Sequence, residues 1–388
     1  MWKLVQSGLS VVAGTAEPEY GPESIHPVCS DLAQGEPLYS PLTLEDMQYK
    51  VPSQTCVETQ TFYFMDDVFY GFAQVIHSNL VGLHTTAQFT FKIFKKSKPE
   101  DYVWTSTKLE NFRIDGANFY ADNLSIKLDD AQKVYKIKSS VTPQSVVDLT
   151  MELVGEGIKF GKDGTTYYGT DIENPWGSMR HIFWPRCKST GTISLEGNKL
   201  FEDTVKLDSG LGMYVMALQG MKPHHAAATW NFLNYQSSEY SAVVMEFTTP
   251  KSYNTTTVSV AMVADKEGKI ILGSTNNKIK HIKTYEDSVS GWNVPGEIEF
   301  TVGGEDLKAV ISGPLKQLSE RVDVMNELPQ FVKNIASGVA GTKPYIFQFS
   351  NELEFKLIKN GTVERTEHGY GYTEATFISA IVKPDESA

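Results

Sequence analysis

The chain has 388 residues, of which 41% are hydrophobic and 11% aromatic, and its formal net charge at pH 7 is -12. These values exclude a wholly disordered chain and leave room for two domains with cores of their own. The acidic balance argues against nucleic acid as a partner, because neutralising phosphates requires clustered lysine and arginine.

The first 16 residues predict an amphipathic helix that lies on a membrane surface. With successive side chains about 100° apart, the helix would place Trp2, Val5 and Leu9 on one face and serine and glutamine on the other. Because the polar face carries a single lysine, binding would depend on inserted apolar side chains more than on attraction to anionic lipid. A helix this short must be ordered on binding, which favours reversible attachment. The residues expected to contact the membrane are Met1, Trp2, Leu4, Val5, Leu9 and Val12.

The bulky Trp2 leads us to expect that Met1 is retained and N-terminally acetylated. Acetylation would remove the charge from the positive end of the helix. Two alternatives stay open at this point. Instead of a membrane-binding helix, the segment could be a frayed tail. It could also be a secretory signal peptide, with Lys3 in its basic region and Ala16 at its cleavage site, although polar residues interrupt the apolar core that such a peptide needs.

Three cysteines, Cys29, Cys56 and Cys187, are widely spaced and odd in number. This usage fits unpaired thiols in a reducing compartment better than a disulfide framework. No run approaches the roughly 18 apolar residues that a spanning helix needs, so the body of the chain is expected to be soluble.

The order of short apolar segments predicts two consecutive all-β units. Residues 17–56 contain six prolines and are expected to form an irregular linker that wraps around the rest. Beyond them, segments rich in Val, Thr, Ile, Phe and Tyr alternate with turn residues, which predicts one antiparallel barrel over 57–215 and a second over 216–388. Helical spacing is found only between 318 and 341, where Pro329 is expected to kink or split the helix.

The second unit has unusually apolar strands. Its segments WNFLNYQ, YSAVVMEF and VSVAMVA are apolar or small on one face. A barrel of about eight strands encloses room for side chains or for one ligand. The pattern therefore indicates either an apolar cavity or a packed core, and it does not decide between them.

Searches for chemical motifs predict no cofactor and no metal. The chain lacks the phosphate-binding, nucleophile-elbow and zinc-protease signatures, and its glycine-rich strings lack dinucleotide spacing. His224 and His225 are adjacent, so in an extended segment they would point in opposite directions and could not readily share a metal. The basic run from Lys92 to Lys98 is expected to be a solvated hairpin turn.

The segment DIENPWGSMRHIFWPRC, from Asp171 to Cys187, is the main candidate for binding outside the N-terminus. Arg180 and Arg186 could bind a polar head group or carboxylates of the other barrel, while the aromatic residues supply apolar area. The alternative is a structural plug between the domains. Glu374 is expected either to pair with such an arginine or to contact ligand. The candidate ligand-binding or interdomain residues are Trp176, Arg180, Phe183, Trp184, Arg186, Trp230 and Glu374.

Several long strings closely resemble the fungal survival factor 1 family, and the resemblance covers essentially the whole chain. The strings are MWKLVQSGLSVVAGTAEPEYG, VETQTFYFMDD, YGFAQVIHSNLVGLHTTAQFT, NPWGSMRHIFWPR and GYGYTEATFI. The resemblance implies two tandem lipocalin-like barrels, related in architecture to bacterial carotenoid hydratases. It also implies a role in surviving oxidative stress and in non-vesicular ceramide transfer from endoplasmic reticulum to Golgi, with an acetylated N-terminal helix as the membrane anchor.

Residues and resemblance together predict a peripheral-membrane lipid carrier rather than an enzyme. A ceramide-like lipid would enter an apolar barrel cavity, and no covalent chemistry would be required. The alternatives are a carotenoid-hydratase-like enzyme, with Asp171, Glu173 and Glu374 as its acids and bases, and a ligand-free stress-response scaffold. The expected partners are the lipid and a membrane surface. The expected location is the cytoplasm and the surfaces of the Golgi and endoplasmic reticulum, with the nucleus as a further place.

Overall fold

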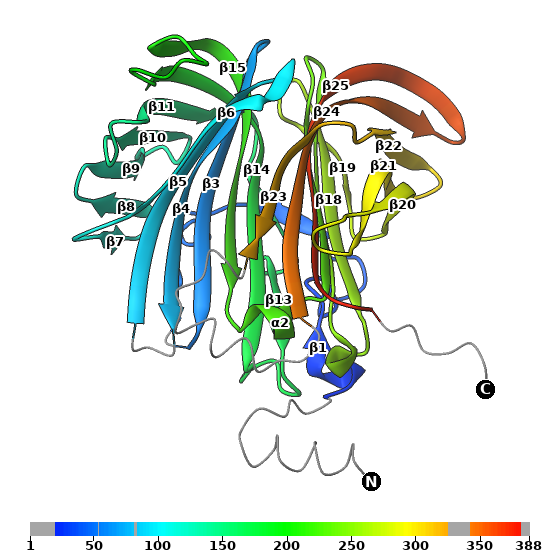
Figure 1. Cartoon of the computed structure of the whole chain (residues 1–388). Coiled ribbons are helices and arrows are strands. Elements are labelled where there is room, and N and C mark those ends of the chain that lie inside the picture. The colour runs from blue at the N-terminus through cyan, green and yellow to red at the C-terminus, as the bar shows by residue number, and fades with distance from the viewer. Residues whose placement is uncertain (1–19, 53, 81–83, 325–341, 382–388) are drawn as a thin grey trace.

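The computed structural model describes residues 20–52, 54–80, 84–324 and 342–381. Two curled antiparallel sheets lie side by side, and each bends around an apolar core of its own (Figure 1). The expected all-β architecture of two tandem lipocalin-like barrels is thereby confirmed. The amphipathic helix expected over 1–16 lies outside the described residues. In the described part of the chain, no helix is long and apolar enough to cross a membrane.

The first sheet has 15 strands, and its main path runs β6-β5-β4-β3-β15-β14-β11-β10-β9-β8-β7. Off this path, β12 and β13 pair with β14, β2 pairs with β12, and β1 pairs with β13. The strands are β1 (Ile25–His26), β2 (Tyr39–Pro41), β3 (Cys56–Met65), β4 (Phe69–Leu80), β5 (His84–Lys95), β6 (Lys98–Lys108), β7 (Arg113–Asp115), β8 (Asn118–Ala121), β9 (Leu124–Leu128), β10 (Val134–Ser139), β11 (Val146–Leu153), β12 (Ile158–Phe160), β13 (Thr165–Tyr168), β14 (Gly177–Ser194) and β15 (Thr204–Gln219).

The second sheet has ten strands, and its main path runs β19-β18-β17-β16-β25-β24-β22-β21-β20, with β23 paired to β24. Three short helical turns complete the described structure, namely η1 (Pro22–Ser24), α2 (Pro223–Ala226) and η2 (Lys251–Tyr253). The strands are β16 (Thr229–Gln236), β17 (Tyr240–Thr248), β18 (Thr257–Asp265), β19 (Ile270–Ser274), β20 (Asn277–Glu286), β21 (Asn293–Gly303), β22 (Leu307–Pro314), β23 (Leu318–Asp323), β24 (Thr342–Lys359) and β25 (Thr362–Ser379).

Both sheets are curled but open in the residues that the structure describes. The end strands β6 and β7 are not hydrogen bonded to each other, and neither are β19 and β20. The first sheet ends at Gln219 and the second begins at Thr229, with α2 between them. Residues 17–56, expected to be irregular, contribute the short strands β1 and β2 to the first sheet.

The prediction of a helix beginning at Leu318 is wrong for its first residues. Leu318–Asp323 form strand β23, in which Arg321 lies opposite Phe347 of β24. Pairing with a neighbouring strand satisfies the backbone there and overrides the local helical spacing, as tertiary contacts commonly do. The rest of the predicted helix, from 325 onward, lies outside the described residues.

A third apolar cluster, which we call the seam, lies between the two sheets. Strand β3 shows how it forms, because Phe62 and Phe64 point into the first barrel whereas Tyr63 and Met65 point away from it. Side chains alternate along a strand, so a strand that is apolar on both faces is buried on both. The buried apolar residues of the seam are Ile25, Val28, Tyr63, Met65, Tyr70, Phe72, Phe94, Ile158, Phe160, Tyr168, Met179, Phe183, Met213, Val215, Met221, Ala226, Ala227, Phe232, Val243, Met245, Phe247, Tyr253, Val258, Val260, Met262, Tyr370, Tyr372 and Ile378.

The expectation that Lys92 belongs to a solvated turn is wrong. Its side chain is fully buried, and its ammonium forms an ion pair with Glu320 of β23 and donates to the Ser319 carbonyl oxygen, 3.1 Å away. Phe91 and Ile93 point into the first core, so Lys92 points to the side of the second sheet, and the turn begins only after β5 ends. The pair ties the two sheets together.

This ion pair predicts unequal effects of removing either partner. Glu320→Gln leaves a buried ammonium unpaired, and we expect it to lower the free energy of unfolding by about 3 kcal/mol. Lys92→Met keeps the bulk of the side chain and leaves a carboxylate that is 22% exposed and can reach water, so we expect a loss below about 1.5 kcal/mol. Urea denaturation measures both losses. Equal losses would contradict the assignment.

Candidate functional site

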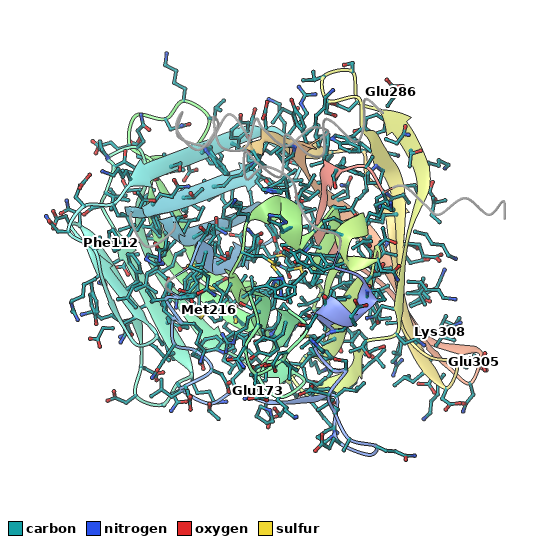
Figure 2. The ribbon with its side chains drawn as sticks, turned by 90° about the horizontal axis from the view of Figure 1, so that it is seen from below. Phe112, Glu173, Met216, Glu286, Glu305 and Lys308 are labelled. Carbon is teal, nitrogen blue, oxygen red and sulfur yellow. The ribbon has the colours of Figure 1, made fainter. Side chains whose placement is uncertain are left out.

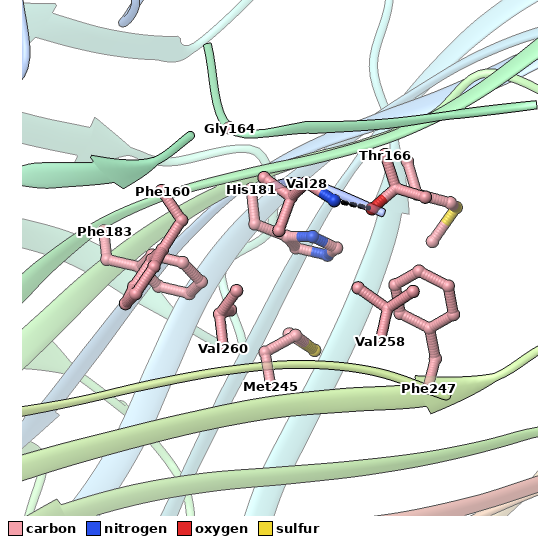
Figure 3. A pocket seen from close by; sticks show the side chains of 11 residues that line it. Val28, Phe160, Gly164, Thr166, His181, Phe183, Met245, Phe247, Val258 and Val260 are labelled. Carbon is pink, nitrogen blue, oxygen red and sulfur yellow. Dashed lines mark hydrogen bonds between the residues drawn. The ribbon is translucent and has the colours of Figure 1, made fainter. Parts of the chain in front are cut away.

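A small cavity lies in the seam where β14 of the first sheet faces β17 and β18 of the second (Figure 3). Its volume is about 10 Å³. That is room for roughly one water molecule. The cavity is lined by Val28, Phe160, Gly164, Thr166, Met179, His181, Phe183, Met245, Phe247, Val258 and Val260.

The alternation of side chains along β14 builds this site. Met179 and Phe183 belong to the seam, whereas Ile182 and Trp184 belong to the core of the first barrel. His181, midway between Met179 and Phe183, therefore points into the seam with them. Figure 3 shows its imidazole among apolar side chains of both sheets.

His181 is the residue that sequence analysis missed. It is 6% exposed, and its ring lies nearly parallel to that of Phe183, with centroids 6.2 Å apart, and nearly perpendicular to that of Trp230, with centroids 5.7 Å apart. Among the described residues, neither ring nitrogen makes a hydrogen bond. The segment DIENPWGSMRHIFWPRC drew attention to arginine and tryptophan, but the period of two along a doubly buried strand is the signal that identifies this histidine.

Burial keeps His181 uncharged. Loss of solvent lowers the pKa of its imidazole to about 3, and the positive charge of Arg180 acts in the same direction. A neutral imidazole has one N–H donor and one nitrogen acceptor. Thr166, the other polar side chain in the lining, already accepts a hydrogen bond from the Val28 N–H at 3.1 Å. The Thr166 hydroxyl can still donate its hydrogen, so the site is an apolar cavity lined by two neutral polar side chains, the His181 imidazole and the Thr166 hydroxyl.

Three of the predicted aromatic residues lie along the seam, and one does not. Phe183 lines the cavity, and Trp230 contacts His181 and donates its indole N–H to the Met245 sulfur. Trp176 is 42% exposed and donates to the hydroxyl of Tyr253, in η2 between β17 and β18, at 2.9 Å. Trp184 instead lies inside the first barrel, where its ring centroid is 5.2 Å from that of Tyr135 and 5.3 Å from that of Tyr214.

The two arginines of the same strand have different roles. Arg186 donates from Nη1 to the Ser237 carbonyl oxygen at 3.1 Å and to Ser241 Oγ at 2.8 Å, and from Nη2 to the Ser238 carbonyl oxygen at 2.9 Å. These bonds fasten the first sheet to the β16–β17 hairpin of the second. Arg180 points into the first barrel, where it donates to the backbone oxygens of Asp46 and Asp163.

Glu374 forms no ion pair with Arg180 or Arg186, all three of which lie in the described part of the chain. Its carboxylate accepts hydrogen bonds from Gln348 Nε2 at 2.7 Å and from the Tyr372 hydroxyl at 3.5 Å. Burial raises the pKa of this carboxyl group, while the charge of Lys92 acts against the rise. Glu374 therefore belongs to the seam and to the same polar group of side chains as Lys92.

The acidic residues weighed for acid and base catalysis do not converge. Glu173 lies at the periphery of the molecule, whereas Met216 lies inside it (Figure 2). Asp171 accepts hydrogen bonds within its own turn, from the Glu173 N–H and the Asn174 side-chain amide. Glu374 has separate partners on β24 and β25.

The two histidines of α2 differ from their expected arrangement. His224 and His225 lie in a helical turn, not in an extended segment, and their ring centroids are 4.3 Å apart. Among the described residues, no three His, Cys, Asp or Glu side chains are grouped as metal ligands. The three cysteines form no disulfide.

Methionine is concentrated in the seam. The seam contains six methionines, whereas the core of the second barrel, in its described residues, contains none. Methionine is flexible and fills irregular spaces, so the seam is the part of the molecule that can best repack around a guest. The six are Met65, Met179, Met213, Met221, Met245 and Met262.

The barrel interiors are packed with rigid side chains. In the first barrel, the rings of Phe62 and Tyr214 stack with centroids 4.9 Å apart. In the second, the ring of Phe355 stacks on Tyr235 at 5.7 Å and on Tyr240 at 4.9 Å. The small cavity lies in the seam and not among these side chains.

A larger cleft of about 630 Å³ opens at one end of the seam. Met65 and Tyr370 belong both to its lining and to the seam. Its other walls are polar, and the Lys96 ammonium lies 4.5 Å from the centre of the Tyr370 ring. The polar or charged residues that line it include Asp66, Asp67, Lys96, Ser97, Ser209, Gln236, Ser237, Ser238, Gln317, Glu352 and His368.

The low pKa of His181 predicts a measurable loss of stability in acid. Below about pH 6 the unfolded chain binds a proton at this histidine that the folded chain does not bind, so the free energy of unfolding falls as pH falls. The contribution is about 1.4 kcal/mol per pH unit. Between about pH 6 and pH 4, the free energy of unfolding measured by urea titration should fall about 2 kcal/mol less in the His181→Phe variant than in the unmodified chain. Parallel curves would contradict a buried neutral histidine.

Comparison with known proteins places this architecture in a family. Residues 2–379 match the Svf1 family, which confirms the resemblance seen in the sequence. The ceramide-binding protein SVF1 of Debaryomyces hansenii is 56% identical over 387 residues, covering 98% of this chain and all of that protein. The protein of the same name from Candida albicans is 54% identical, and the match covers 98% of this chain and 100% of that protein. The one from Emericella nidulans is 46% identical, and the match covers 97% of this chain and 99% of that protein.

Solved structures show the same fold at low sequence identity. CghA superposes with a TM-score of 0.60 at 13% identity, covering 93% of this chain and 99% of its own. Kievitone hydratase from Nectria haematococca superposes with a TM-score of 0.54 at 12% identity, and the match covers 93% of this chain and 98% of that protein. The double curled sheet is thus shared beyond close relatives, and the matches along its full length show that the chain belongs to the Svf1 family.

Proposed function

We propose that this protein is a peripheral-membrane lipid carrier that binds a ceramide-like sphingolipid in the seam between its barrels. The observation that carries the proposal is the seam itself, an apolar layer with six methionines and, in its small cavity, the neutral imidazole of His181. Relatives at 44–56% identity and nearly full coverage are named ceramide-binding proteins, which supports this class of ligand.

The seam suits a lipid better than either barrel does. Opening a barrel interior would separate stacked rings such as Phe62 and Tyr214. Opening the seam requires methionines such as Met179 and Met245 to change rotamers while the barrels stay intact. The cleft at one end already separates the two sheets and continues into the seam through Met65.

The energetics favour exchange over storage. Each buried methylene gains about 0.8 kcal/mol relative to water, whether it lies in a bilayer or in an apolar protein interior. Moving a lipid from one to the other therefore changes its free energy little, and loading and unloading can follow the lipid's concentration in each membrane. Such a carrier needs no catalytic step.

Membrane attachment is assigned to residues 1–16, and the described chain begins next to the seam. The N–H of Tyr20 donates to the Ser252 carbonyl oxygen of the second barrel at 2.9 Å, and its ring lies 4.8 Å from that of Trp176 on the first. A helix joined to the chain here would bring this end of the seam to a bilayer. We extend the proposal to transfer from endoplasmic reticulum to Golgi and to survival of oxidative stress, as the family resemblance implies.

Lipid transfer by the purified full chain tests the proposal. We expect ceramide to be found by mass spectrometry on protein purified from its native source, and fluorescent ceramide to move between liposomes in its presence. Met245→Trp narrows the seam and should lower the transfer rate at least about fivefold, since overpacking costs about 1–3 kcal/mol. Met216→Leu, a volume-conserving change in the first core, serves as control. A folded protein that carries no lipid and moves none would refute the carrier.

The anchor is tested separately by liposome flotation. Val5→Asp or Leu9→Asp places a charge on the expected apolar face, and we expect membrane binding to fall at least about tenfold, because a buried apolar side chain contributes about 1.5–3 kcal/mol. In cells, such a variant should be released to the cytosol and lose transfer, with an unchanged unfolding curve. Ser7→Asp, on the polar face, is the matched control. Membrane binding by the Val5→Asp variant equal to that of the control would refute the anchor.

A further inference from the structure

We propose that His181 holds the polar head of the bound lipid and restricts the ligand to lipids whose head is uncharged. This inference rests on the carrier function proposed above and adds to it the site and the chemical class of the head group. It concerns one residue that neither the sequence motifs nor the names of the relatives assign.

The surroundings of His181 leave it without a partner inside the protein. Its side chain is 6% exposed, and no described residue hydrogen bonds to its ring nitrogens. Nine of the eleven residues that line the cavity are apolar or glycine, and the Thr166 hydroxyl, which accepts a hydrogen bond from the Val28 N–H, does not bond to the ring. A buried polar group without a partner is unfavourable. The geometry thus points to a partner that arrives with the ligand.

The chemistry of the ring selects the kind of partner. A neutral imidazole accepts a hydrogen bond at one nitrogen and donates from the other. The head of a ceramide carries hydroxyl groups and a secondary amide, which match both functions without bringing charge. The low pKa of His181 supports this assignment, since the ring stays neutral at physiological pH and has both a donor and an acceptor.

A charged head is disfavoured at the same place. An unpaired phosphate in an apolar layer is strongly unfavourable. The nearest cation on the strand, Arg180, points into the first barrel and is held by the backbone oxygens of Asp46 and Asp163. The charge of Arg180 acts on the His181 ring, but its guanidinium is bonded elsewhere, and the lining of the cavity contains no cation to pair with a phosphate.

The length of the seam suits this orientation of the lipid. Met65 beside the cleft lies opposite Leu211, and Leu211 lies opposite Lys188 of β14, five residues beyond Phe183. Lys188 is seven residues beyond His181, so at about 3.3 Å per residue, with a bulge between, the distance from His181 to this position along β14 is roughly 20 Å. With the head at His181, the hydrocarbon chains can lie along the seam between the two sheets and point toward the cleft.

The competing location for the head is the cleft. Lys96, which lies over the Tyr370 ring, and the pair formed by His368 and Glu352 at 3.5 Å could bind a charged or zwitterionic group there. The two locations predict opposite preferences, because the cleft favours a phosphate and the cavity excludes it.

Equilibrium binding of two fluorescent lipids to the full-length protein separates these possibilities. The probes are ceramide and ceramide 1-phosphate, which share the same hydrocarbon chains and differ by a charged phosphate on the primary hydroxyl of the head. We expect the unmodified chain to bind ceramide at least about tenfold more tightly. His181→Phe should weaken ceramide binding about tenfold, His181→Gln should recover most of it through its amide, and His368→Phe in the cleft should leave it unchanged.

Distinct results overturn the inference and the function beneath it. Equal binding of the two lipids by the unmodified chain refutes the inference, whether or not any variant folds. Ceramide binding by a folded His181→Phe variant at unmodified strength also refutes it, as does a loss caused by His368→Phe instead. If the unmodified chain binds neither lipid, the carrier function itself fails.

Discussion

The packing of two curled sheets against each other is the constraint on which the rest of the structure depends. Each sheet uses one face to enclose its own core and the other to build the seam, so strands such as β3, β14 and β17 have almost no face left for water. Polar groups that lie between the sheets must then find partners there. Lys92 pairs with Glu320, Arg186 bonds to the β16–β17 hairpin, and Tyr70 accepts from Asn234 at 3.0 Å. These contacts fix the register of the two barrels, while the methionines between them leave room for rearrangement.

Much of the fold could be predicted from the sequence, because strand length, alternation and turn residues are local signals. The packing between sheets is not local, and the errors fall there. The spacing of apolar residues from 318 onward suggests a helix, yet Leu318–Asp323 pairs with β24. Lys92 belongs to a basic run in the sequence, yet the sheet that covers β5 buries it. In each case the deciding neighbour is more than 20 residues away along the chain, and the local pattern carries no trace of it.

The candidate site was predictable in part for the same reason. Phe183 and Trp230 were selected for their apolar area; Phe183 lines the cavity, and Trp230 contacts His181. Trp184 was selected with them, but it follows Phe183 directly, so its side chain points to the other face of β14 and lies in the first core. His181 has the phase of Phe183 but carries no motif, so only its burial between two sheets distinguishes it from an ordinary histidine. In a tandem barrel, the strands that form the contact between the barrels are therefore apolar on both faces, and the sequence does not show which face makes the contact.

The position of Tyr20 has a mechanical consequence. Its backbone is hydrogen bonded to η2 of the second barrel, and its ring packs on Trp176 of the first, so one residue bears on both halves of the molecule. A force applied to the chain on its N-terminal side is divided between the barrels at that point. Any tether formed by the preceding residues would load the two halves together, and its strain would be felt first by the contacts that hold Tyr20, Trp176 and Tyr253 in place.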